Sequence, residues 1–227
     1  GVETGDTVSA TAEGYAYNSA NVSGAAIITA TGITLEGKDK GNYTLPERPI
    51  IVGGSITKSS SLTAPDAPTA AKTTDTSITL KEIPGAEYSM DSVKWQSSPI
   101  FTGLTRNTEY TFYARIGATD NTYASPASEE AKITTEKTSL EGAQITVIGT
   151  YIYTGKAQIP EKSEVKVTLA SGEMVGSDQY NISAANNTNA GTATATITAA
   201  DSGDFIGQAK MQPTFTIGRK PVTVTPN

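Results

Sequence analysis

The sequence predicts an all-β protein in which small two-layered sandwich domains follow one another along the chain. Apolar and polar residues alternate over short stretches, and no segment of about twelve residues or more keeps the 3.6-residue period of a helix. Threonine, a β-branched residue that suits a half-exposed sheet, is abundant. Hydrophobic residues make up 37% of the 227 residues and aromatic residues 7%. These low fractions favour several thin cores over one large interior.

The strongest alternation marks individual strands. Thr192–Ala199 places threonines on one side and alanines with an isoleucine on the other, so we expect the threonines to face water. In the same way, Tyr110, Phe112, Ala114 and Ile116 are predicted to share one face of a strand. Shorter alternating stretches predict further strands at 78–81, 165–169, 215–217 and 222–224. The 21 glycines and 11 prolines, spread along the chain, supply the turns between them.

Two polar breaks divide the chain into segments. Residues 58–68 form a connector rich in serine and proline, and residues 135–139 form a second polar break. The predicted domains are therefore residues 1–60, 61–137 and 138–219, and residues 220–227 are a tail or the start of a following repeat.

Charge and composition argue against several kinds of partner. The net charge is −6 and the pI is near 4.8, without a cluster of Lys and Arg, so we expect no nucleic-acid partner. No apolar run approaches the about 20 residues that span a bilayer, so we expect no membrane insertion by this segment. The chain begins with Gly1 and not with Met, so we interpret it as a piece of a longer protein.

The sequence contains no histidine and no cysteine, which removes the usual general base and the ligands that zinc, copper and iron prefer. Carboxylate pairs remain, at Glu129–Glu130 and at Glu161 with Glu164, but adjacent charges in strands are usually solvated. Oxygen ligands for calcium exist at Asp201 with Asp204 and at Asp39 with Asn42, without the dense spacing of a calcium loop. We therefore expect no enzyme, no cofactor, and no catalytic or metal-binding residue. The sequence leaves open a Lys–Asn isopeptide crosslink.

One aromatic pair is a candidate ligand site. Trp95 is the single tryptophan, and together with Tyr88 or Tyr113 it could form a platform on which a sugar stacks. The alternative is that Trp95 packs over the edge of a sheet. The sequence leaves both interpretations open, and Trp95 with Tyr88 is the predicted ligand-binding pair.

The middle segment resembles a fibronectin type III domain. The resemblance rests on Pro65 and Pro68 before a first strand, and on a Leu-x-x-x-Thr-x-Tyr element at Leu104–Tyr110. In that family the tyrosine hydroxyl bonds back to the backbone just upstream, which implies this role for Tyr110. Ser77–Leu80 and Ala131–Thr135 are similar to two further strands of the family, although the first of these lacks the family's usual tryptophan.

The outer segments resemble repeats of bacterial adhesins. Residues 33–43 are similar to the end of YDG/MBG-type repeats, and residues 139–217 are similar to Ig-like modules of Gram-positive surface proteins. Asp39–Tyr43 and Asp201–Phe205 share the form Asp-x-Gly-(Asn/Asp)-aromatic, which predicts a turn whose aromatic residue enters a core. The first segment is short for a complete sandwich, so we expect it to have an open sheet edge that invites strand addition.

Together these features imply tandem Ig-like and fibronectin-type sandwiches in a bacterial adhesin-like protein, extracellular and attached to the cell wall or cell surface. The expected function is a non-catalytic stalk or spacer whose partners include neighbouring repeats of the same polypeptide. Two alternatives stay open: a recognition module that binds host protein or glycan through loops at a sandwich end, and accessory domains of a secreted carbohydrate-active enzyme.

Overall fold

The computed structural model describes residues 1–25, 27–45, 50–52 and 54–224, with the side chains of 50–52 outside the description. These residues form nineteen β-strands and three single turns of 3₁₀-helix, and they contain no α-helix. The predicted all-β class is thus confirmed. The chain divides into two compact units, which are described separately. Unit 1 comprises residues 1–68, 81–99 and 111–131, and unit 2 comprises residues 69–80, 100–110 and 132–227.

The start of unit 1 consists of two small antiparallel sheets. One pairs β1 (Ser9–Thr11) with β4 (Thr34–Glu36), and the other has the order β2-β3-β5, with β2 at Gly14–Tyr17, β3 at Ile27–Thr31 and β5 at Ile50–Val52. The 3₁₀ turns lie at Val22–Gly24 and Lys40–Asn42. Among the described residues up to 45, Ala25 alone is buried. The described side chains of these sheets therefore form no hydrophobic core.

The remainder of unit 1 is built on the antiparallel pairing of β8 (Ala86–Ser89) with residues 113–116 of β10 (Glu109–Ile116). Tyr88, Phe112 and Ala114 are fully or almost fully buried. The predicted connector, residues 58–68, is bonded to this unit through Ser59. The Ser59 N–H donates to the Asn121 carbonyl at 2.8 Å, and the Ser59 carbonyl accepts from the Tyr123 N–H at 2.9 Å.

Unit 2 begins with a three-stranded antiparallel sheet of order β6-β7-β9, with β6 at Ala70–Thr73, β7 at Ser77–Leu80 and β9 at Ile100–Thr102. Ile78 and Leu80 of β7 are buried, as their alternation predicts. The hydroxyl oxygen of Tyr110 accepts a hydrogen bond from the backbone N–H of Thr105 at 2.8 Å. The hydrogen bond expected between the Tyr110 hydroxyl and the backbone just upstream is therefore present. β11 follows at Ala131–Thr134.

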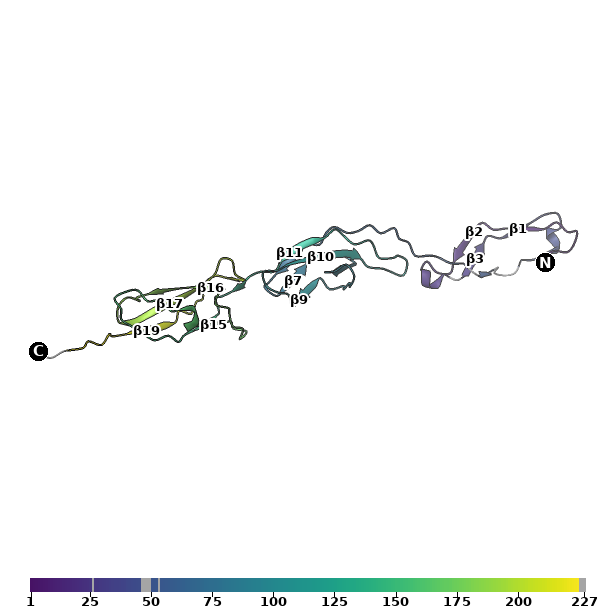
Figure 1. Ribbon diagram of the computed structural model, residues 1–227. Coiled ribbons are helices and arrows are strands. Elements are labelled where there is room, and N and C mark those ends of the chain that lie inside the picture. Colours follow the sequence, from purple (N-terminus) through teal and green to yellow (C-terminus); the bar gives the residue numbers. More distant parts are fainter. Residues whose placement is uncertain (26, 46–49, 53, 225–227) are drawn as a thin grey trace. The chain divides into compact units, whose positions relative to one another are not determined.

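The larger part of unit 2 is a two-layered sandwich. One layer pairs β13 (Gln144–Val147) with β15 (Val165–Thr168), and the other has the order β14-β19-β17-β16, part of which is labelled in Figure 1. The remaining elements are β12 (Thr138–Ser139), β14 (Tyr151–Ile152), the 3₁₀ turn Lys162–Glu164, β16 (Tyr180–Ala185), β17 (Gly191–Ala199), β18 (Phe205–Ile206) and β19 (Thr214–Gly218).

Side chains from both layers meet in one apolar cluster. Ile145 and Val167 from the first layer lie with Tyr180 and Ile197 from the second, and each is at most 5% exposed. In β17 Ala193, Ala195 and Ile197 are buried and Ala199 is partly buried, while none of the threonines is buried, as the alternation predicts. The period-2 pattern thus identified the core face of this strand correctly.

The two Asp-x-Gly-aromatic turns differ in what their aromatic residue does. Phe205 is buried in the unit 2 cluster, as predicted. Tyr43 is only partly buried, which corrects the prediction for this turn, and its hydroxyl donates to the Asp6 carboxylate at 2.8 Å. The described residues around this turn form no buried apolar cluster that the ring could enter. Residues 222–224, predicted as a strand, have no strand partner among the described residues.

Candidate functional site

Tyr88, one of the two predicted ligand-binding residues, is a buried structural side chain. It is 2% exposed. Its hydroxyl accepts a hydrogen bond from the Ile83 N–H at 2.7 Å and donates to the Lys81 carbonyl at 3.2 Å. Both hydrogen-bonding roles of the hydroxyl are therefore satisfied locally, where residues 81–83 lead into β8.

Trp95, the other predicted residue, is partly buried and its ring is covered by Arg115. The guanidinium carbon of Arg115 lies 4.3 Å from the centre of the indole ring. The same guanidinium is held by the Glu87 carboxylate, with Nη2 at 2.7 Å and Nε at 2.8 Å from one oxygen. One face of the tryptophan is thus already occupied by a cation that has its own counter-ion.

Strand register places Trp95 and Tyr88 on opposite faces of the sheet. Tyr88 lies opposite Ala114 and Gln96, whereas Glu87 lies opposite Arg115. Because successive side chains of a strand point to opposite faces, Glu87 and Arg115 share the face of Trp95 and not that of Tyr88. The structure therefore does not bring the predicted pair together as one platform. Tyr113, two residues before Arg115, belongs to the Trp95 face.

The loop that carries Trp95 is organised by Asp91. One carboxylate oxygen accepts hydrogen bonds from the N–H groups of Lys94 at 2.8 Å and Val93 at 2.9 Å, and from the Ser89 hydroxyl at 3.0 Å. These bonds, with the Lys94 and Val93 amides foremost, hold the pKa of Asp91 below its ordinary value. The ionised carboxylate of Asp91 therefore stabilises the loop.

A second candidate site lies in unit 2, where residues 135–140 are hydrogen-bonded to other segments on two sides. On one side, the Thr135 N–H donates to the Thr108 carbonyl at 3.0 Å and the Glu136 N–H to the Thr74 carbonyl at 2.9 Å. On the other side, the N–H groups of Thr138 and Leu140 donate to the carbonyls of residues 204 and 206, both at 3.0 Å. β12 pairs in parallel with β18 there. The polar break predicted at residues 135–139 is thus a hydrogen-bonded junction and not a free linker.

Arg106 provides the principal side-chain contact at this junction. Its guanidinium carbon lies 4.7 Å from the centre of the Phe205 ring, and it forms an ion pair with Glu173. The neighbouring Asn107 donates from Nδ2 to an Asp204 carboxylate oxygen at 3.1 Å. Sequence reasoning did not identify this cluster. Its only sequence signal was that Phe205 follows a recognisable turn, which says nothing of an arginine 99 positions away in the chain.

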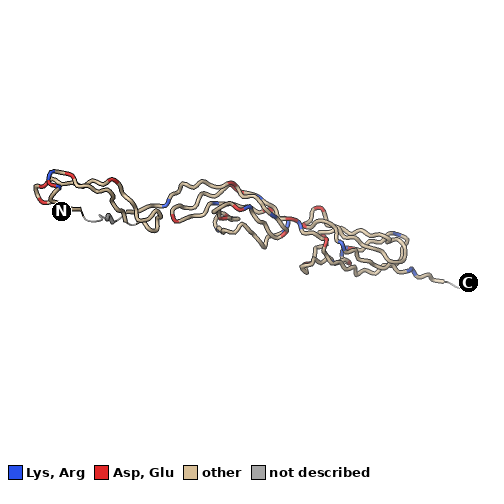
Figure 2. The backbone as a smooth tube through the Cα atoms, turned by 180° about the vertical axis from the view of Figure 1, so that it is seen from behind, with Lys and Arg blue, Asp and Glu red and all other residues tan. Residues whose placement is uncertain are grey.

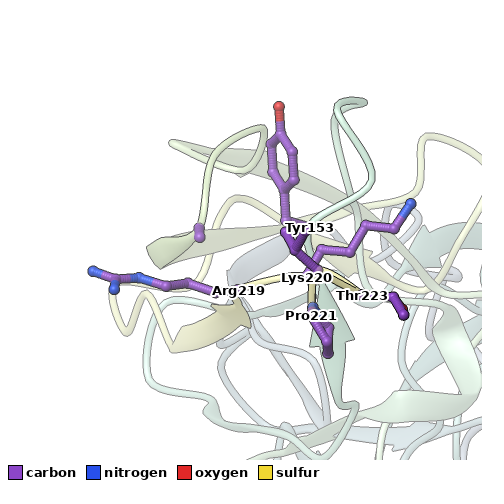
Figure 3. Close-up of a pocket in the computed structure, with 7 residues that line it drawn as sticks. Tyr153, Arg219, Lys220, Pro221 and Thr223 are labelled. Atoms are coloured by element: carbon purple, nitrogen blue, oxygen red, sulfur yellow. The ribbon is translucent and has the colours of Figure 1, made fainter. Parts of the chain in front are cut away.

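Unit 2 also has an open hollow of about 620 Å³ beside residues 219–223, lined further by Tyr153 and Ala190. Figure 3 shows that the side chains of Arg219 and Lys220 point in opposite directions, away from one another. They do not converge on a common point, so the hollow has no arrangement that would hold an anion.

Glu161 and Glu164, one of the carboxylate pairs considered for chemistry, have local structural partners. Glu164 accepts the Tyr151 hydroxyl at 2.7 Å and the Glu161 backbone N–H at 3.0 Å, closing a capping box around the short 3₁₀ turn. Burial first, and then the bond to Glu164, raise the pKa of Tyr151 above its ordinary value. Within the described part of the chain, His, Cys, Asp and Glu form no group of three or more that could hold a metal ion.

Charges are distributed without a dominant stretch of one sign, since Figure 2 shows basic and acidic residues interspersed along both units. The described residues include no helix with the length and apolar character needed to cross a membrane.

Comparison with known protein families finds a similarity in the first segment. The YDG domain family matches residues 1–50, which confirms the resemblance to YDG-type repeats predicted from residues 33–43. None of the curated proteins matches the chain.

Proposed function

We propose that this chain is a non-catalytic spacer segment of an exported, adhesin-like bacterial surface protein. In this proposal a fibronectin type III-like domain and an Ig-like domain follow the YDG-type segment end to end, and the protein is extracellular and attached to the cell wall or surface of a Gram-positive bacterium. The resemblances in residues 61–137 and 138–219 support the domain assignment, and the YDG match supports a repeat-containing protein.

The observation that carries the proposal is the hydrogen-bonded junction at residues 135–140. A flexible linker lets consecutive domains turn freely, whereas a segment bonded on both sides limits that freedom. Here backbone hydrogen bonds tie the junction to residues 74 and 108 on one side and to residues 204 and 206 on the other. Arg106 adds an ion pair and a ring contact across the same region. Restricted rotation is what a spacer needs in order to transmit position and force.

The test uses pairs of spin labels, for which a chain without cysteine is well suited. Labels at Lys72→Cys and Lys166→Cys, both on exposed strand positions on either side of the junction, should give one narrow distance distribution. A control pair at Lys166→Cys and Thr216→Cys, within one sandwich, sets the width expected of a rigid body. A broad distribution for the first pair beside a narrow one for the control would contradict the spacer.

The alternative is recognition of a host protein or glycan, and it rests on Trp95 being partly exposed. Screening the chain against glycans and host proteins, together with Trp95→Ala and the neighbouring Val93→Ala as matched control, tests it directly. Specific micromolar binding that Trp95→Ala removes and Val93→Ala retains would make recognition the better assignment. Accessory domains of a secreted carbohydrate-active enzyme would show the same binding toward its polysaccharide substrate.

A further inference from the structure

The loop after β10, residues 117–124, contacts the first segment of unit 1 through one asparagine side chain. The Asn121 Oδ1 accepts a hydrogen bond from the backbone N–H of Val22 at 2.9 Å, and the Asn121 Nδ2 donates to the Asn21 Oδ1 at 2.9 Å. These partners are 99 and 100 positions away in the chain. The acceptor and the donor of a single amide are therefore both used on two neighbouring residues of the first segment.

The short turn at Val22–Gly24 explains why these two groups are available to the loop. A helical turn has no internal acceptor for its first N–H groups, and the residue before it commonly accepts one of them with its own side chain. Asn21 occupies that position, but its side chain makes no capping bond with the described residues of the turn. The Asn21 oxygen thus remains available to Asn121, and the acceptor for the Val22 N–H comes from outside the first segment.

The tip of the loop is shaped by its own hydrogen bonds. The Thr119 hydroxyl oxygen accepts from the N–H groups of Asn121 at 3.2 Å and Thr122 at 3.1 Å. At the base of the loop, the Ser125 N–H donates to the Ile116 carbonyl at 3.0 Å. A loop that is already ordered loses little conformational freedom when it meets a partner, so more of the contact energy is retained.

The connector is bonded to the same loop beside Asn121. The Lys58 Nζ donates to the Thr119 carbonyl at 2.8 Å, and Ser59 forms a parallel bridge with Thr122. The Asn121 carbonyl accepts the Ser59 N–H at 2.8 Å, so this residue contacts the connector through its backbone and the first segment through its side chain.

We propose that residues 117–124 are the docking surface for the YDG-type segment, residues 1–50, and that Asn121 is the side chain that positions it. Because the amide donates one bond and accepts the other, both bonds form together in a single alignment of the segment. The docked segment turns with the rest of unit 1 and not about the connector. The inference goes beyond the spacer proposal, since it concerns other residues and applies equally to a recognition module.

Amide hydrogen exchange at Val22 measures the docking, because this N–H is released only when Asn121 withdraws. Asn21→Ala removes the second bond of the Asn121 amide but leaves the acceptor of the Val22 N–H in place. Since the two bonds belong to one contact, this change should speed Val22 exchange about fivefold after correction for the intrinsic rate. Asp120→Ala, at the exposed neighbour of Asn121 in the loop, should leave the rate unchanged. Equal exchange in Asn21→Ala and in the unsubstituted chain would overturn the proposal.

A pair of spin labels tests whether the first segment is held in one place. Labels at the exposed positions Ala16→Cys in β2 and Glu130→Cys, just before β11, should give one narrow distance distribution in this cysteine-free chain. Asn21→Asp combined with Asn121→Asp sets two carboxylates against one another, and their repulsion should broaden the distribution. Asn21→Asp alone keeps an acceptor for the Asn121 Nδ2 and should leave it narrow. A broad distribution in the labelled chain without these changes, or a narrow one in the double variant, would contradict the docking.

Discussion

Replacement of Arg106 by alanine is the most direct probe of the junction in unit 2. The side chain is 18% exposed and combines a guanidinium stacked over Phe205 with an ion pair to Glu173. A cation over an aromatic ring contributes about 0.5–2 kcal/mol. The ion pair adds less, about 0–1 kcal/mol, since the Glu173 side chain is 47% exposed and water screens the charge. We expect a total loss of about 1–2 kcal/mol in the free energy of opening the junction.

Amide hydrogen exchange measures this quantity at the junction itself. The N–H groups of Thr138 and Leu140 are hydrogen-bonded to residues 204 and 206, so they exchange only when β12 and β18 separate. A loss of about 1–2 kcal/mol predicts exchange that is about 5 to 30 times faster at these two amides. Arg106→Lys keeps the charge but not the planar group, and should fall between wild type and alanine.

Lys132→Ala is the matched control for this experiment. Lys132 pairs with Glu109 at 3.7 Å, and the two side chains are 56% and 57% exposed. Removal of this solvated pair should cost less than about 0.5 kcal/mol and leave the exchange of Thr138 and Leu140 unchanged. If Arg106→Ala also left those amides unchanged, the arginine cluster would not stabilise the junction and the reasoning would be refuted.

Three further predictions concern single side chains. Tyr110→Phe removes the acceptor of the Thr105 N–H and should lower the free energy of unfolding by about 1 kcal/mol, measured by chemical denaturation; an unchanged midpoint would show that water replaces the bond. The raised pKa of Tyr151 means that the folded state keeps the phenol proton to higher pH than the unfolded state does. The contribution of Tyr151 to the free energy of unfolding is therefore intact below about pH 10 and is lost as pH rises further. Tyr151→Phe should flatten the alkaline fall in melting temperature. The lowered pKa of Asp91 gives the opposite pH dependence. The contribution of Asp91 to the free energy of unfolding is intact above about pH 4 and is lost as pH falls through the folded-state pKa. The fluorescence of Trp95 should therefore show an acid transition that Asp91→Asn removes, and an identical transition in both proteins would assign it elsewhere.

Features set by nearby residues could be predicted from the sequence. The buried face of β17 follows from alternation alone, since Ala193, Ala195 and Ile197 are spaced two apart. The Tyr110 hydrogen bond spans five residues and was expected from a short motif.

The candidate sites depended on pairings between distant residues. Trp95 and Tyr88 are seven positions apart, and only the register of β8 against β10 shows that they occupy opposite faces. The position of Arg115 over the indole ring likewise follows from that register.

The sequence by itself determined the β class, the core side of the strongest strands and the YDG character of the first segment. Only the tertiary structure decided that Tyr43 stays near the surface, that Arg106 meets Phe205, and that residues 135–140 are bonded on both sides. The physical reason is that a period of two residues specifies which way a side chain points relative to its own strand. Which side chain it then meets depends on how strands far apart in the chain align, and that is settled only when the sheets form and pack.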